Sequence, residues 1–170
     1  HDQEEALIMS DRIAVMFGGR IAQLAPPEAL YRRPVSLDVA SFIGVMNVLP
    51  ARVQVTDGRA IRAEIAGLGP AELAPDQCPG GVRPGDVRVG LRPETMHLLD
   101  ADAPATGRVA EGTVAEVTYY GDMTCYDVRL DGAERPVTIS MKNLFGQAVV
   151  DRGARTRVVW DPRALVLFAE

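Results

Sequence analysis

The stretch RVGLRPETMHLL at residues 88–99 aligns without gaps to RVVWDPRALVLF at residues 157–168. Each copy begins with an apolar run, reaches a proline (Pro93 or Pro162), and continues into a second apolar run. Similarity of this kind indicates a duplicated structural unit, although one short match can also arise by chance. We predict that each copy is a strand, a proline corner and a final strand that closes a small barrel of about five strands.

Short alternating apolar runs surround both copies and fill the chain from residue 47 onward, which predicts half-buried strands. Turn dipeptides such as Asp57-Gly58 and Asp131-Gly132 separate the runs at intervals typical of a small sandwich or barrel. Residues 68–79 are rich in Ala, Pro and Gly, so we interpret them as a loop. Two half-repeats, at about 47–105 and 106–170, account for this part of the chain.

Residues 1–46 have a different sequence pattern, which predicts helices as well as strands. Helix formers at residues 3–9 predict a short helix, and the runs RIAVM and IAQLA around Gly18 and Gly19 predict a hairpin. A Pro-Pro pair before EALYRR and Ser36 before LDVASFI predict two more helices. The fold class is therefore mainly β with a short α/β N-terminal segment, and we expect separate domains at 1–46 and 47–170.

Composition and charge exclude several classes of function. The 170 residues are 47% hydrophobic, yet no stretch approaches the roughly 18 apolar residues of a membrane span, and no signal peptide is visible. We expect a soluble chain without direct membrane insertion. The formal net charge is -5 and Lys142 is the only lysine, so there is no basic stripe for a phosphate backbone and we expect no nucleic-acid partner.

Residues that could ligate a metal are isolated from one another. Cys78 and Cys125 form neither a CxxC pair nor a cluster, which favours two reduced structural thiols. His97 lies in a predicted strand with no Cys, His or acidic cluster at ligand spacing. We therefore predict no metal site.

Other candidate residues have a simpler structural interpretation. Tyr119 and Tyr120 could stack on bases, but no Lys or Arg lies beside them. Arg32 and Arg33 fit a solvated helix face better than an anion site, because no glycine-rich cradle adjoins them. Trp160 aligns with Leu91 in the repeat, which predicts a place in the core.

The opening, HDQEEALIMSDRIAVMFGGRIAQLAPPEALYRRPVSLDVASFIG, resembles the end of the nucleotide-binding domain of ABC importers. The order of its parts carries the resemblance: a histidine before DQxEA, SDRIAVM, a glycine-rich turn, a proline-led helix with YRRP, and a closing FIG. The resemblance implies that His1 is the switch histidine, which contacts the γ-phosphate of ATP and helps to orient the attacking water in the intact parent ATPase. Because the sequence already has helical character at His1, we expect that the chain is a piece of a longer protein.

The sequence lacks the other parts of an ATPase. It has no GxxxxGK[ST] loop, no acidic pair for Mg²⁺ and water, and no signature motif. We expect that the chain by itself neither hydrolyses ATP nor binds a cofactor, whereas its parent would use ATP and Mg²⁺.

The second part is similar to the transport-associated OB (TOBE) domain that follows the ATPase in importers of sugars, polyamines and iron. GLRPE at residues 90–94 looks like the corner of that domain, and VTYYG at residues 117–121 looks like its second-half strand and turn. The resemblance implies an OB-like pair of small β-barrels. Asn47, which follows FIG, is nearer to the polyamine-type pattern, while sugar and iron stay open.

The resemblance implies a function in binding. We expect a regulatory and dimerisation region of a homodimeric ATP-binding subunit that contacts transmembrane permease subunits at the cytoplasmic face of the cell membrane. The alternative is an OB-like domain that senses a small ligand or an oxyanion.

Overall fold

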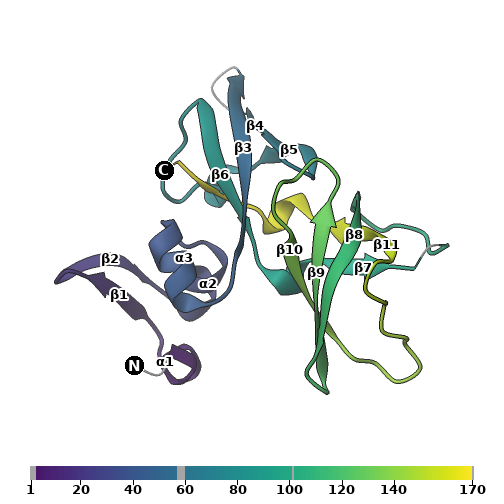
Figure 1. Cartoon of the computed structure of the whole chain (residues 1–170). Helices are drawn as coiled ribbons and strands as arrows, with labels where there is room; N and C mark the ends of the chain where they lie inside the picture. Colours follow the sequence, from purple (N-terminus) through teal and green to yellow (C-terminus); the bar gives the residue numbers. More distant parts are fainter. Residues whose placement is uncertain (1–2, 57–59, 101, 170) are drawn as a thin grey trace.

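The computed structural model describes residues 3–56, 60–100 and 102–169. The N-terminal segment contains three short helices around a two-stranded hairpin, in the predicted order (Figure 1). Its elements are α1 (Gln3–Met9), β1 (Ile13–Phe17), β2 (Arg20–Ala25), α2 (Pro27–Arg32) and α3 (Leu37–Ile43). The remaining elements belong to two antiparallel sheets that curl toward each other (Figure 1).

Local sequence explains the N-terminal elements. Gly18 and Gly19 turn the hairpin at φ values of 55° and 76°, a region that glycine adopts without strain. Pro27 occupies the first turn of α2, where its missing donor costs nothing. The side chain of Ser36 accepts a hydrogen bond from the Val39 amide at 3.3 Å and so caps α3.

The first sheet has the strand order β12-β6-β3-β4-β5, and the second has the order β10-β9-β8-β11-β7. The strands of the first sheet are β3 (Asn47–Thr56), β4 (Ala60–Ile65), β5 (Gly69–Leu73), β6 (Gly85–Leu91) and β12 (Val166–Phe168). Those of the second are β7 (His97–Leu99), β8 (Arg108–Tyr119), β9 (Met123–Leu130), β10 (Val137–Lys142) and β11 (Arg155–Trp160). Three 3₁₀ turns connect them: η1 (Pro75–Gln77), η2 (Pro93–Thr95) and η3 (Pro162–Ala164). The prediction of a mainly β, OB-like fold is confirmed.

The sequence repeat corresponds to two strand–corner–strand units, β6-η2-β7 and β11-η3-β12, as predicted. The expectation that each copy closes its own barrel is wrong, because the two copies exchange their last strands. Strand β7 pairs with β11, where Leu98 lies opposite Val158, and β12 pairs with β6, where Leu167 lies opposite Val89. Each sheet is therefore completed by the other copy.

The prediction of a loop over residues 68–79 is also wrong. Residues 69–73 form β5, which pairs with β4 and buries Ala71 and Leu73, and η1 follows. Strand β5 lies at the edge of its sheet, where Pro70 can be accommodated although it has no amide to donate. In the sequence, Gly69 and Pro70 hide the short alternation of buried and exposed residues along this strand.

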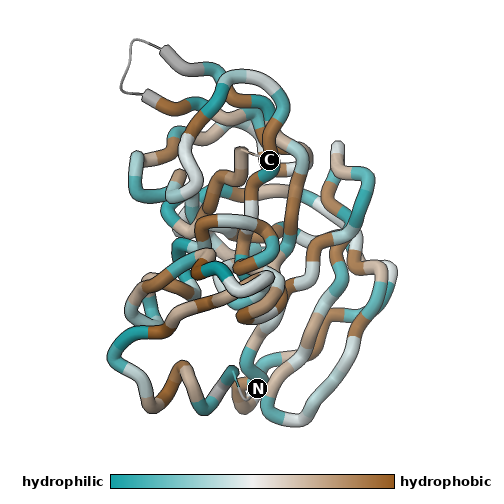
Figure 2. The backbone as a smooth tube through the Cα atoms, turned by 90° about the vertical axis from the view of Figure 1, so that its left-hand side faces the viewer, coloured by the Kyte–Doolittle hydropathy of each residue, from teal (hydrophilic) through white to brown (hydrophobic). Residues whose placement is uncertain are grey.

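The largest apolar cluster draws on both sheets and includes Trp160, which is 1% exposed, as predicted from its match to Leu91. Hydrophobic and hydrophilic residues alternate along the strands (Figure 2), as expected where one face of each sheet is buried. Cys78 is buried, Cys125 is half-buried, and both are free thiols.

The hairpin buries one face against the helices that follow it. Val15 packs with Leu30, Val39 and Ile43 in a second, smaller apolar cluster. The hairpin also leaves large apolar side chains exposed, among them Met16, Ile21 and Leu24. Within the described residues, no helix is long and apolar enough to cross a membrane.

Candidate functional site

The junction between the N-terminal segment and the two sheets is organised by Arg92, the arginine of the GLRPE corner. Its side chain is 4% exposed. Nη1 donates to the carbonyl oxygens of Ala40 and Val45 at 3.2 and 2.9 Å, and Nη2 donates to that of Tyr31 at 3.2 Å. Carbonyls near the C-terminal ends of helices lack partners within the helix, so one guanidinium satisfies acceptors at the ends of both α2 and α3.

The ring of Tyr31 closes this contact from the other side. The Arg92 guanidinium carbon lies 4.2 Å from the ring centroid, and the Tyr31 hydroxyl donates to Glu94 Oε1 at 2.8 Å. Burial, and then the contact with Glu94, raises the pKa of Tyr31 to about 12. Burial also lowers the pKa of Arg92, which forms no ion pair with any described residue. We call Tyr31, Arg92 and Glu94 the joint.

Apolar contacts and close backbone approach complete the junction. Ala40 of α3 packs against Val166 and Phe168 of β12. A Cβ at Gly80 would lie 2.6 Å from the Val35 carbonyl oxygen, so only glycine allows this approach. Arg33, at the end of α2, donates to Asp76 at 3.1 Å and to the Arg163 carbonyl at 3.1 Å. The segment is therefore attached to both η1 and η3 as well as to η2.

Asn47 links the start of β3 to the second sheet. Its amide donates to the Thr138 carbonyl at 2.7 Å and accepts from the Thr138 amide at 2.8 Å. The side chain thus pairs with β10 as a neighbouring strand would, and it does so at the edge of that sheet. The asparagine that follows FIG in the sequence has this structural role.

A cavity of about 570 Å³ opens beside the joint. Helix α2, the two proline corners η2 and η3, and the start of β12 supply its walls. The lining residues are Tyr31, Arg32, Arg33, Met46, Arg92, Glu94, Thr95, Asp161, Arg163, Ala164 and Val166. The joint cavity therefore lies between the N-terminal segment and both copies of the repeat.

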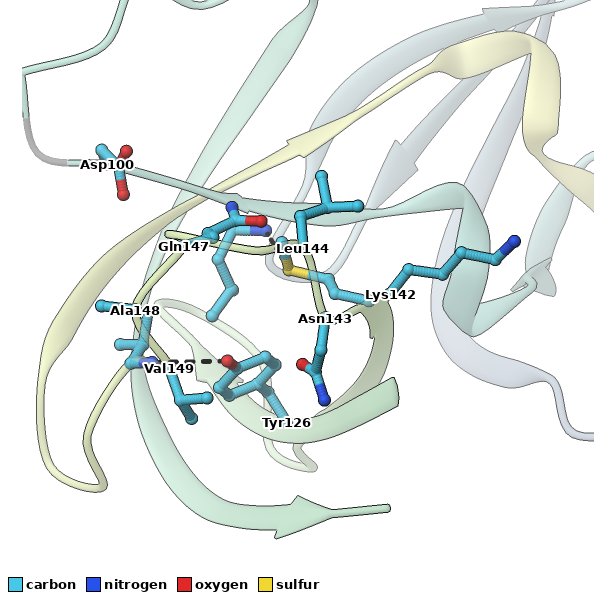
Figure 3. Close-up of a pocket in the computed structure, with 11 residues that line it drawn as sticks. Asp100, Tyr126, Lys142, Asn143, Leu144, Gln147, Ala148 and Val149 are labelled. Atoms are coloured by element: carbon cyan, nitrogen blue, oxygen red, sulfur yellow. Dashed lines mark hydrogen bonds between the residues drawn. The ribbon is translucent and has the colours of Figure 1, made fainter. Parts of the chain in front are cut away.

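A second cavity lies under the loop that joins β10 to β11 (Figure 3). Its volume is about 20 Å³, which is room for about one water molecule. The Tyr126 hydroxyl accepts a hydrogen bond from the Val150 amide at 3.3 Å, and Lys142 extends away from Tyr126 (Figure 3). With so little space and no converging charges, this cavity does not favour the alternative of an oxyanion sensor.

The sequence-predicted site residue His1 lies outside the described residues. His97 is exposed on β7, and no group of three or more His, Cys, Asp or Glu in the described part of the chain is placed to hold a metal. Tyr119 and Tyr120 are exposed at the end of β8 and in the following turn. The expected solvated face holds for Arg32, which pairs with Glu28, but Arg33 is tied to η1 and η3.

Sequence reasoning identified the GLRPE motif but missed the part that Arg92 plays. The available signal was an arginine directly between Leu91 and Pro93, at the end of an apolar strand. Charged residues are rarely buried unless they are paired or hydrogen-bonded. An arginine at such a place indicates a buried anchor.

Comparison with known proteins agrees with this architecture. Residues 89–168 match the TOBE domain family. The chain is 42% identical over 141 residues to the spermidine/putrescine import ATP-binding protein PotA of Pseudomonas aeruginosa, which covers 82% of this chain and 38% of the relative. It is 39% identical over 178 residues to the protein of that name from Frankia alni, which covers 100% of this chain and 38% of the relative.

The chain matches the C-terminal part of TOBE-containing ATP-binding subunits of ABC importers. It spans about two fifths of the length of these relatives. A solved structure of the cytoplasmic molybdate-binding protein ModG, with molybdate bound, has the same fold, with a TM-score of 0.56 over 73% of this chain and 96% of that one. At 16% identity this likeness concerns the fold alone.

Within this family of subunits, the joint connects two recognisable parts. The helices that it holds belong to the segment that resembles the ATPase edge, and the corner that holds them belongs to the TOBE domain. The joint lies beside both sheets, because η2 leads directly from β6 of one sheet to β7 of the other.

Proposed function

We propose that this chain is the regulatory part of an ATP-binding subunit that energises polyamine import. The names of the relatives, which refer to spermidine and putrescine import, support the polyamine class over sugar and iron. The division into an ATPase edge at 1–46 and a TOBE region at 47–170, with half-repeats at about 47–105 and 106–170, is part of the same proposal.

The observation that carries the proposal is the joint. Arg92 bonds to backbone carbonyls on α2, on α3 and at Val45, so one buried side chain helps to hold the segment that resembles an ATPase edge against the TOBE domain. A charged group with several buried hydrogen bonds resists displacement, since breaking them leaves both partners unsatisfied. The TOBE domain can therefore follow movements that ATP causes in the ATPase.

Catalysis is assigned to the intact parent subunit. There His1 would act as the switch histidine at the γ-phosphate, and ATP and Mg²⁺ would be held by residues beyond this chain. The described residues offer no acidic cluster for a metal and no glycine-rich phosphate cradle. The exposed apolar side chains of the hairpin, such as Ile21 and Met16, give the remainder of the subunit a surface to cover.

The proposed partners are a second copy of the subunit and two transmembrane permease subunits, at the cytoplasmic face of the cell membrane. Such an arrangement places the ATPase edge near the permeases. Homodimers of this kind are closed by symmetry, so two TOBE regions would lie on related sides of the assembly.

The test uses the full-length subunit with its permease subunits in proteoliposomes that enclose ATP and Mg²⁺. We expect saturable, ATP-dependent uptake of labelled spermidine, with no comparable uptake of maltose or ferric iron. Transport of sugar or iron in place of spermidine would overturn the substrate class. Absence of any ATP-dependent uptake in an assembled complex would overturn the transport function.

A further inference from the structure

We propose that one end of the second sheet, formed by Tyr119, Tyr120, Leu144 and Phe145, is the surface through which two copies of this chain contact each other. We call these four side chains the aromatic end. The contact rests on the homodimer of the proposed function and assigns to it a surface that the proposed function leaves open.

The aromatic end carries the most exposed large apolar side chains of the two sheets. Tyr119, Tyr120 and Leu144 are 63%, 64% and 64% exposed, and Phe145 is fully exposed, more than any other large apolar side chain from residue 47 onward in the described part of the chain. The end of β8, the start of β9 and the end of β10 lie together, because these strands are antiparallel neighbours (Figure 1). Apolar and aromatic side chains gathered in this way mark interaction surfaces of soluble proteins.

Phe145 lies at the tip of a tight turn. The Gln147 amide donates to the Leu144 carbonyl at 3.1 Å, and Gly146 has a φ of 81°, which fits the third position of a type II turn. A ring that is held on a short turn loses little conformational freedom when it binds. Phe145 is therefore suited to be the anchor of a contact.

Asn143 fastens this turn to the turn between β8 and β9. Its backbone amide donates to the Asp122 carbonyl at 2.8 Å, and its side-chain amide donates to the Gly121 carbonyl at 2.7 Å. Its side-chain oxygen accepts from the Thr124 hydroxyl at 2.6 Å. The aromatic end is thus one preformed surface, although its two halves are more than twenty residues apart in the chain.

Charge favours a second copy as the occupant of this surface. The two turns, residues 119–123 and 142–149, contain one acidic side chain, Asp122, and one basic side chain, Lys142. Both are exposed, and neither forms an ion pair in the part of the chain that the structure describes. The whole chain has a net charge of -5, so two copies repel each other in general but not at this balanced end. A single lysine gives little attraction to an anionic membrane or to nucleic acid.

A two-fold axis between the two turns satisfies both the apolar and the charged groups. The β8–β9 turn of each copy then packs on the Leu144–Phe145 turn of the other, and Asp122 of each copy faces Lys142 of the other. Stable interfaces bury about 800 Å² on each partner, and the three aromatic side chains, at roughly 150–250 Å² each, supply about half of this area. The contact gains strength in the full-length subunit, where the proposed pairing of the ATPase parts already brings two copies together.

The first experiment measures dimerisation of the chain by sedimentation equilibrium over a series of concentrations. We expect a reversible equilibrium between monomer and dimer. Phe145→Ser should raise the dissociation constant about tenfold or more, because it removes the anchor of the contact. The matched control is Ile21→Ser, which shortens an exposed apolar side chain of the hairpin and should leave the dissociation constant unchanged.

Charge reversals locate the two-fold contact. Asp122→Lys and Lys142→Asp should each weaken dimerisation about tenfold, because two attractive pairs become repulsive. An equal mixture of the two variants should dimerise again, since every pair across the axis then has opposite charges. The control is Arg62→Glu on the first sheet, which changes the net charge as much as Lys142→Asp does and should weaken dimerisation far less.

Three results would overturn the contact: a chain that stays monomeric at every concentration, a mixture of the two charge variants that dimerises no better than either alone, or an equal loss in the control variants. The permeases are the other candidate occupant. If the chain is monomeric and Phe145→Ser in the full-length subunit abolishes co-purification with the permease subunits, the aromatic end binds the permeases instead. None of these results bears on the solute that is transported, so the contact and the import function can fail separately.

Discussion

At the residue scale, two polar side chains replace backbone pairing where the chain passes between its parts. Arg92 satisfies carbonyls at the ends of α2 and α3, and the amide of Asn47 pairs with both backbone groups of Thr138. Each is largely buried, so its hydrogen bonds are not exchanged readily for water. Specific residues therefore fix the geometry that the strands alone leave open.

Replacement of Asn47 should be costly for this reason. Asn47→Ala removes two hydrogen bonds and leaves the Thr138 amide and carbonyl without them, so we expect a loss of about 1–3 kcal/mol in the free energy of unfolding. Urea denaturation followed by circular dichroism measures this loss. The control is Gln54→Ala, an exposed position on the same strand, and an equal effect of both variants would contradict the role of Asn47.

Tyr31 gives the joint a dependence on high pH. Its pKa is about 12 in the folded chain, above the ordinary value of 10.0, so the folded state holds this proton more tightly. The stability that it contributes is complete below pH 10 and is lost as the pH rises toward 12. We expect Tyr31→Phe to flatten the decline in stability over this window, as measured by urea midpoints at successive pH values. If stability declined as steeply with pH in Tyr31→Phe as in the unsubstituted chain, the role of Tyr31 in this pH dependence would be contradicted.

At the scale of elements, the exchange of β7 and β12 ties the two copies of the repeat together. Neither copy of the repeat forms a complete sheet by itself, because the last strand of each copy pairs with the first strand of the other copy. Each copy alone would expose an unpaired edge and part of the shared core.

A split chain tests this dependence. Residues 1–105 and 106–170, produced separately, should each lack cooperative unfolding of the β structure, and mixing them should restore the dispersed amide spectrum of the whole chain. The cut falls in the connection between β7 and β8 and interrupts no strand. Cooperative folding of residues 106–170 alone would refute the claim that the copies complete each other.

The same elements show what the sequence could and could not predict. The strands around Val87, Val128 and Ile139 follow alternation that the chain displays locally. Among the predicted helices, α2 begins with a proline and α3 is capped by Ser36. Strand β5 was missed because its edge position admits Pro70 and shortens the visible pattern. The exchange was missed because alternation indicates a strand but not its partner, which depends on contacts between residues far apart in the chain.

The site was predictable to a smaller extent. The motif with Arg92 could be recognised as a corner, but its contacts with Tyr31 and Ala40 join positions about fifty residues apart or more. The joint cavity combines α2 with both corners, so it exists only once the copies have exchanged strands. Local spacing carries no signal for either feature.

At the scale of the whole molecule, a junction of a few contacts joins the N-terminal segment to the two sheets. The N-terminal segment has its own small apolar cluster and the sheets have another. The two parts meet at the joint, at the hydrogen bonds of Arg33 to η1 and η3, and at Ala40 against β12. If Arg92 is the principal anchor, its loss should release α2 and α3 while the sheets keep their stability.

Native-state hydrogen exchange in Arg92→Gln tests this claim most directly, with Arg88→Gln, an exposed position on the adjoining strand, as the control. The amides of Leu30 and Ala40, which bond within α2 and α3, report on the segment, and Ile139 reports on the second sheet. We predict that Arg92→Gln lowers the opening free energy at Leu30 and Ala40 by about 2 kcal/mol or more, with Ile139 nearly unchanged and no effect in Arg88→Gln. If the amides of Leu30 and Ala40 were protected from exchange equally in Arg92→Gln and in the unsubstituted chain, the claim that Arg92 anchors α2 and α3 would be contradicted.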